Sequence, residues 1–221
     1  MNRTQFWKIC VLCLVSALGN AVVSYFFNNI VGFPLYLDTI FNAAMCFCAG
    51  LLPGLITGVL LSPIMYFLVC RFLLGLSVEL SLFRNIWVIC IAVEVLLVWV
   101  FHFRMKKRED LFHKNPSLQS FISVAALLLV LVVLDCLAVS ISGGIIDFTL
   151  LTLQAPRTFS PEDSFKLGLL RNKVPLLPTA ILSRIPINIV DRFIVIFGGF
   201  GISLLYRKAL SNNKEQRVNN K

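Results

Sequence analysis

Charged side chains are scarce in this chain. Only 14% of its 221 residues are Asp, Glu, Lys or Arg, whereas 58% are hydrophobic. A soluble globular domain has about 25% charged residues. The shortage leaves little of the chain suited to face water, and apolar runs of about twenty residues are long enough to cross roughly 30 Å of hydrocarbon as helices. The composition therefore predicts an all-α, polytopic membrane protein.

Motifs that carry enzyme chemistry are also missing. The sequence contains no Gly-x-x-x-x-Gly-Lys-Ser/Thr phosphate loop, no His-Glu-x-x-His zinc motif and no Gly-x-Ser-x-Gly elbow. Its two histidines, His102 and His113, have no catalytic partner nearby in the sequence. The seven cysteines are odd in number and fall mostly in apolar runs, where Cys usually acts as a small apolar residue. We therefore expect no catalytic residues, metal or cofactor in this chain.

The basic residues give a formal net charge of +9, but they occur in short blocks beside the apolar runs. Lys and Arg in such positions set the orientation of membrane spans. We therefore interpret the charge as a topology signal and expect no nucleic-acid partner.

Six apolar runs indicate six spans in a single membrane domain. They cover approximately Phe6–Phe27, Leu35–Ala49, Leu55–Cys70, Ile86–Phe103, Leu118–Ser142 and Pro186–Tyr206. Gly50–Gly54 is expected to form a tight turn between the second and third spans, and Pro63 to break the third.

The blocks of positive charge orient these spans. One block precedes the first span, one lies between Arg104 and Lys114, and one lies in the tail 207–221. An even number of spans places all three blocks on the same side, which the positive-inside rule identifies as cytoplasmic. The prediction is a multi-pass protein of the cell membrane with both termini in the cytoplasm.

The only long connection, residues 143–185, is then expected on the outer side. Ser160-Pro161-Glu162-Asp163 is a helix start signal, and the following residues predict a short amphipathic helix that ends before Pro175. This segment fits either a lid over a pocket or a plain connector.

Ionisable residues inside spans are costly and mark functional hypotheses. They are Asp38, Glu94, Asp135, Asp191 and Arg192. All except Glu94 are expected in the outer half of the membrane, beneath the long connection. They suit a solute-binding pocket, and Asn188 is a further polar candidate. The competing interpretation is structural pairing, for example of Arg192 with Asp38. Asp191 and Arg192 are adjacent, so they project about 100° apart and are not expected to face one partner.

Small residues at four-residue spacing allow helices to approach closely. Ala17 and Ala21 form such a pair in the first span, and Gly54 and Gly58 form one in the third. For the glycines of the third and sixth spans, packing within the chain is favoured. For Ala17 and Ala21, internal packing and contact with a partner are equally supported.

Two segments carry a resemblance to a known family. One runs from Gly32 to Gly58 and contains Leu-Asp38-Thr-Ile-Phe-Asn-Ala-Ala, and the other is Arg184-Ile-Pro-Ile-Asn-Ile-Val-Asp-Arg192 leading into Gly198-Gly199. With six short spans and a long connection before the last, the chain resembles the substrate-binding (S) components of energy-coupling factor transporters.

This resemblance implies that the chain binds a vitamin-like small molecule from outside, within membrane lipid, and docks on a transmembrane coupling protein that carries two ATPase subunits. Ala17 and Ala21 match the docking surface of the family. Asp38, Glu94, Asp135, Asn188 and Arg192 are the candidate substrate-binding residues. Since the first segment is also similar to membrane sensory domains that precede kinases, a standalone sensory or regulatory module is the alternative.

Overall fold

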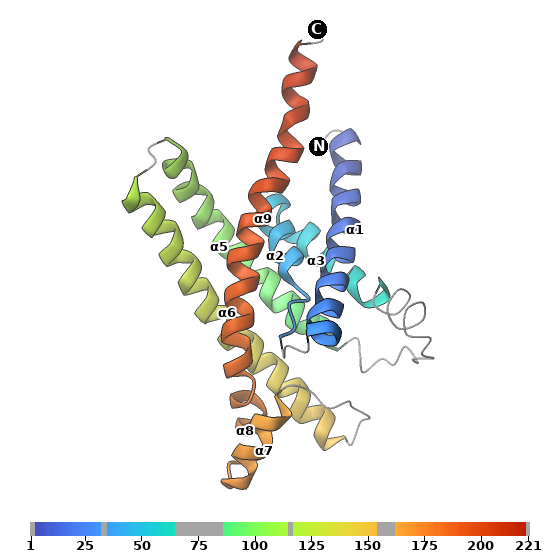
Figure 1. Cartoon of the computed structure of the whole chain (residues 1–221), viewed down its shortest axis with the longest axis vertical. Helices are drawn as coiled ribbons and strands as arrows, with labels where there is room; N and C mark the ends of the chain where they lie inside the picture. The colour runs from blue at the N-terminus through green and yellow to red at the C-terminus, as the bar shows by residue number, and fades with distance from the viewer. Residues whose placement is uncertain (1–2, 32–34, 65–85, 115–116, 154–161, 220–221) are drawn as a thin grey trace.

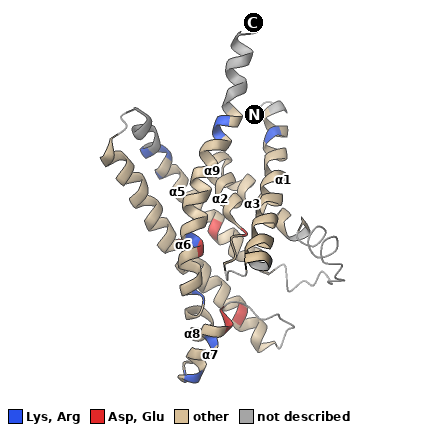
Figure 2. Cartoon of the chain, viewed as in Figure 1, with Lys and Arg blue, Asp and Glu red and all other residues tan. Residues whose placement is uncertain are grey.

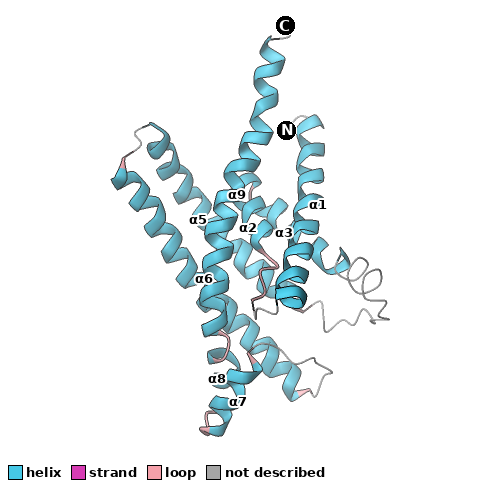
Figure 3. Ribbon diagram, viewed as in Figure 1, coloured by secondary structure: helices cyan, strands magenta, loops and turns pink. Residues whose placement is uncertain are grey.

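The computed structural model describes residues 3–31, 35–64, 86–114, 117–153 and 162–219, and within these ranges all regular structure is helical (Figure 1, Figure 3). The all-α prediction is therefore confirmed. The elements are α1 (Arg3–Tyr25), the π-helical segment η1 (Phe26–Val31), α2 (Ile40–Ala49), α3 (Leu51–Ile64), α5 (Val88–Lys114), α6 (Leu118–Thr152), α7 (Asp163–Arg171), α8 (Leu176–Leu182) and α9 (Ile185–Asn219).

Four segments of the described chain are long and apolar enough to cross a membrane. They are Gln5–Tyr25, Val88–Lys106, Leu118–Thr152 and Leu176–Leu210, and no more than 33% of the examined window of each is buried inside the protein. Large apolar side chains such as Val11, Leu129 and Leu205 are instead exposed. Such an apolar surface is stable against lipid and unstable against water. The chain thus has the features of a membrane protein.

Two further apolar helices are shorter. The helix α2 has 10 residues and α3 has 14. At the usual rise they measure about 15 Å and about 21 Å, less than the hydrocarbon thickness. Length and composition alone therefore identify four spans rather than the six predicted.

The helix α2 lies at the centre of the bundle and packs against α9, α3, α1 and α5. Its residues 42–47 are all buried. At Gly199 of α9, an added Cβ would lie 2.9 Å from the carbonyl oxygen of Ile40, so only Gly lets the two helices approach this closely. Gly54 and Gly58 of α3 similarly pack against α2 and α5. The predicted internal role is confirmed for Gly54, Gly58, Gly198 and Gly199, but not for Gly201, which has no heavy atom within 4 Å of an added Cβ.

The ends of the helices separate into two groups. Both termini and the C-terminal end of α5 lie at one end of the molecule, at the top of Figure 1. The short helices α7 and α8 lie at the opposite end. Lys and Arg at the N-terminal end of α1 and in the C-terminal halves of α5 and α9 gather towards the first of these ends (Figure 2). The fold therefore has a basic end and an α7–α8 end.

Several helices differ from the predicted span boundaries, and α5 and α9 continue to Lys114 and Asn219, beyond the predicted ends at Phe103 and Tyr206. The helix α6 continues to Thr152, although the connection was predicted to begin at Gly143. Gly143 and Gly144 remain helical because their missing side chains leave room for the Arg184 side chain and for the backbone of Ile181. The predicted short helix is α7, but α8 was not predicted. Ser160 and Pro161 of the start signal lie outside the described residues, as does the end of the third predicted span, 65–70.

Around α2 the chain also departs from the prediction. Residues 35–39 are not helical, so the second predicted span is helical only from Ile40. Gly50 alone separates α2 from α3, with a φ of 96° that favours glycine, where a turn over 50–54 was predicted. The predicted break at Pro63 is not tested, because α3 is described only to Ile64 and the residues that follow lie outside the described ranges.

Candidate functional site

Four ionisable side chains meet inside the helix bundle, and we call them the central cluster: Glu94, Asp135, Asp191 and Arg192. They come from α5, α6 and α9, of which α6 packs against both α5 and α9. Each side chain has a relative exposure of 4% or less. From the sequence, all of these residues except Glu94 are expected in the outer half of the membrane. In the structure, the long Arg192 side chain reaches Glu94 and joins it to the other three.

Arg192 occupies the middle of the central cluster. Its Nη1 donates a hydrogen bond to Glu94, and its Nη2 donates one to Asp191. Its Nε donates a second hydrogen bond to Asp191 at 3.1 Å. The partners of Arg192 are thus Glu94 and its own neighbour Asp191, rather than the predicted Asp38. The guanidinium folds back along α9, which is how two adjacent residues pair despite their divergent directions.

Asp135 accepts fewer hydrogen bonds than the carboxylates of Glu94 and Asp191 do. Its Oδ2 lies 3.8 Å from Nη1 of Arg192, and neither of its oxygens accepts a hydrogen bond within the described part of the chain. Oε1 of Glu94 is likewise buried without a hydrogen-bond partner there. Because an unmet buried polar atom costs about 1–3 kcal/mol, the central cluster retains the capacity to bind a further group.

The non-helical residues 35–39 form one wall beside the central cluster. The Leu37 N–H donates a hydrogen bond of 2.9 Å to Oδ1 of Asp191. Leu37 has a φ of 42°, in the left-handed region that non-glycine residues rarely adopt. A strained backbone held by a buried carboxylate is typical of binding sites. Asp38, the adjacent candidate, is half-buried.

A second group of charges lies towards the α7–α8 end, and the sequence analysis missed it. We call it the α7 cluster: Tyr36, Asp147, Glu162, Asp163, Lys166 and Arg184. Lys166 pairs with Asp147 and, at 2.8 Å, with Asp163. Arg184 pairs with Glu162, which also accepts a hydrogen bond from Tyr36.

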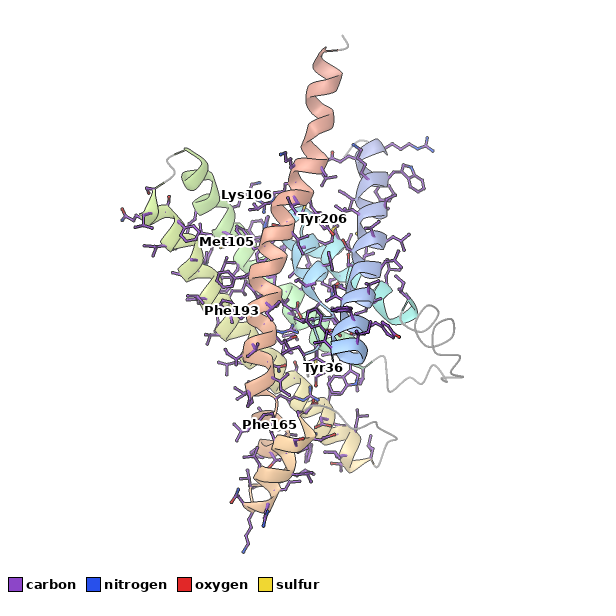
Figure 4. All side chains as sticks on the ribbon, in the orientation of Figure 1. Tyr36, Met105, Lys106, Phe165, Phe193 and Tyr206 are labelled. Carbon is purple, nitrogen blue, oxygen red and sulfur yellow. The ribbon has the colours of Figure 1, made fainter. Side chains whose placement is uncertain are left out.

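The α7 cluster joins α7 to α6, to the chain before α9 and to the residues before α2. The Arg184 guanidinium also lies 4.8 Å from the centre of the Trp87 ring, a cation–π contact. Figure 4 shows Tyr36 on the side of this cluster and Phe165 on α7. Glu162 and Asp163 were interpreted only as a helix start signal. Asp147, which follows a long apolar run, was the signal available in the sequence.

The remaining candidate residues have structural surroundings. Asn188 donates a hydrogen bond of 2.8 Å to Oγ of Ser140, which joins α9 to α6. Ala17 and Ala21 are 0% and 2% exposed, in the face of α1 that packs on α2 and α3. In this arrangement the two alanines contact the rest of the chain and are not presented to a partner.

The chemistry of the central cluster is that of a binding site. Its carboxylates are buried among apolar helices, where charges interact strongly and water is scarce. In the described ranges, no three His, Cys, Asp or Glu side chains are grouped so as to hold a metal ion. The unused oxygens of Asp135 and Glu94 are acceptors for a hydrogen-bond donor or a positive charge.

Comparison with known proteins gives no match: no family model, curated protein or solved structure is similar to this chain.

Proposed function

We propose that this chain is the solute-binding subunit of a membrane uptake system, which captures a vitamin-like molecule from outside. Delivery would proceed through a separate transmembrane coupling protein with two ATPase subunits. The chain itself would act by binding without catalysing a reaction. The observation that carries the proposal is the central cluster, in which buried carboxylate oxygens remain without hydrogen-bond donors.

The resemblance of Gly32–Gly58 and Arg184–Gly199 to the S components supports the same proposal. These segments contribute Asp38, Leu37, Asp191 and Arg192, so the similar residues gather beside the central cluster. The two segments thus supply Asp191, Arg192 and the Leu37 N–H, while Glu94 and Asp135 of the central cluster come from α5 and α6, outside the segments.

We further propose six membrane crossings, with both termini in the cytoplasm. In Figure 1, α1, α2, α3, α5, α6 and α9 alternate in direction between the basic end and the α7–α8 end. The short α2 would complete its crossing together with the non-helical residues 35–39 that precede it. The basic end would face the cytoplasm, and the central cluster would open towards the α7–α8 end.

Native mass spectrometry of the full chain, extracted in mild detergent, tests the solute-binding proposal. We expect one small molecule to co-purify with the chain, together with ATPase subunits in the same preparation. Glu94→Gln preserves the shape of the side chain but removes its charge, so this variant should lose the bound molecule. Arg171→Gln, at an exposed position of α7, should retain it.

A chain that is repeatedly empty and free of ATPase subunits would contradict the proposal and favour the sensory-module alternative. Equal occupancy of the Glu94→Gln and Arg171→Gln variants would show that the solute binds away from the central cluster.

A further inference from the structure

The balance of charge in the central cluster indicates what kind of solute it takes. Three carboxylates, those of Glu94, Asp135 and Asp191, face the single guanidinium of Arg192, a formal excess of two negative charges. All four side chains are at least 96% buried. Buried charges in proteins are normally paired, and an uncompensated charge strongly destabilises the fold.

The hydrogen bonds show where the excess is located. The Nε, Nη1 and Nη2 groups of Arg192 donate to Glu94 and Asp191, so the guanidinium is used by two of the three carboxylates. Asp135 receives no hydrogen bond from the described residues, although Oδ2 faces Arg192 at 3.8 Å. Oε1 of Glu94 is the other unused acceptor. Within the four side chains of the central cluster, the unused atoms are therefore all carboxylate oxygens, and the Thr39 hydroxyl, which is also buried without a hydrogen-bond partner, is a neutral group.

The α7 cluster provides an internal comparison. It also contains three buried carboxylates, but Lys166 contacts two of them and Arg184 contacts the third. Each carboxylate of that cluster thus has a cation within hydrogen-bond distance or closer. A structural network in this chain satisfies its carboxylates, and the central cluster does not.

We infer that the central cluster takes an organic cation, a solute with a positively charged nitrogen that is held by Asp135 and Glu94. This inference rests on the proposed solute-binding function and names the substrate class. A nitrogen cation supplies the positive charge that the cluster lacks, and its N–H groups, where present, are donors for the unused oxygens. An organic cation is favoured over a metal ion, since no three ligating side chains in the described ranges are grouped around one point.

The test uses the purified full-length chain, freed of co-purified solute by extensive washing in detergent until native mass spectrometry shows it empty, and the small-molecule fraction of a rich growth medium. A cation-exchange resin at pH 7 divides this fraction into a retained, cationic pool and a flow-through pool of neutral and anionic molecules. We expect the cationic pool to raise the midpoint of thermal unfolding by about 5 °C or more. The flow-through pool should leave the midpoint unchanged.

Asp135→Asn distinguishes a ligand carboxylate from a structural one. The variant should unfold at the same temperature as the wild type or higher without solute, because it removes a buried charge that accepts no hydrogen bond and only faces Arg192 at 3.8 Å. It should lose the shift caused by the cationic pool, with an affinity weakened on the order of thirtyfold or more. Asp163→Asn, which removes a paired carboxylate of the α7 cluster, should unfold at a lower temperature but keep the shift.

Glu94→Gln serves as the second variant if Asp135→Asn does not fold, and it should also lose the shift. Stabilisation by the flow-through pool alone would overturn the cation inference while preserving the solute-binding function. Stabilisation by neither pool would contradict both the cation inference and the solute-binding function. A cationic shift that persists in Asp135→Asn and Glu94→Gln would overturn the assignment of these two residues.

Discussion

At the scale of single residues, Arg192 holds the interior of the bundle together. It contacts carboxylates from α5 and α9 and lies 3.8 Å from a third on α6. Arg192→Gln removes the only cation of the central cluster and leaves its carboxylates to repel one another in a low-dielectric interior. Because breaking a buried ion pair costs about 3–5 kcal/mol, we expect the free energy of unfolding to fall by about that amount, measured by denaturation in detergent micelles.

Two further variants test whether the loss of stability in Arg192→Gln comes from the broken ion pairs. Arg171→Gln removes the same type of side chain from an exposed position, so its stability should equal that of the wild type. Adding Glu94→Gln to Arg192→Gln removes one of the carboxylates left without a cation, and it should restore part of the lost free energy of unfolding. If Arg192→Gln unfolds like the wild type, Arg192 is not the ion-pair centre that the geometry indicates.

The sequence identified the members of the central cluster but not their pairing. Charges within apolar runs are conspicuous, so Glu94, Asp135, Asp191 and Arg192 were all found. Their pairing depends on how α5, α6 and α9 rotate and pack, which the sequence of each helix does not specify. The α7 cluster escaped notice because Asp147 and Lys166 lie in a segment predicted to be a connection, where charges are ordinary.

At the scale of elements, two glycines have opposite surroundings and give a matched pair of substitutions. An added Cβ at Gly144 of α6 would lie 2.8 Å from Cα and 2.9 Å from the backbone nitrogen of Ile181 in α8. At Gly168 of α7, no heavy atom lies within 4 Å of the added Cβ. Gly144→Ala must therefore displace the α8 backbone, whereas Gly168→Ala fills open space.

We expect Gly144→Ala to destabilise the protein by about 1–3 kcal/mol, as overpacking does. Gly168→Ala should stabilise it by about 0.5–1 kcal/mol, because Ala loses less backbone entropy in a helix. The midpoint of thermal unfolding measures both effects. A Gly144→Ala variant as stable as the wild type would contradict the packing of α8 on α6.

The adjacent glycines Gly143 and Gly144 explain why the end of α6 was predicted ten residues too early, at Ser142 instead of Thr152. A Gly-Gly pair usually indicates a break in a helix. Here Gly143 and Gly144 continue the helix because the close approach of Arg184 and Ile181 requires the absence of side chains. Tertiary packing of this kind involves residues about forty positions away, so a local pattern could not reveal it.

At the scale of the whole molecule, the distribution of charge predicts an orientation that can be measured. Figure 4 places Lys106 of α5 towards the basic end, and Arg171 belongs to α7 at the opposite end. Both side chains are exposed. In a chain whose seven native cysteines have been replaced, Lys106→Cys and Arg171→Cys report on the two ends separately.

We expect a membrane-impermeant maleimide to label Arg171→Cys in intact cells and Lys106→Cys only after the membrane is permeabilised. The physical reason is that positively charged loops resist transfer across the membrane, so the basic end stays in the cytoplasm. A shared reagent and a shared cysteine-free background make the two variants controls for each other. The reverse pattern would show that the orientation is inverted, and equal labelling in intact cells would show that no membrane separates the two ends. Only the expected pattern places the α7–α8 end on the outer side, where a solute must enter to reach the central cluster.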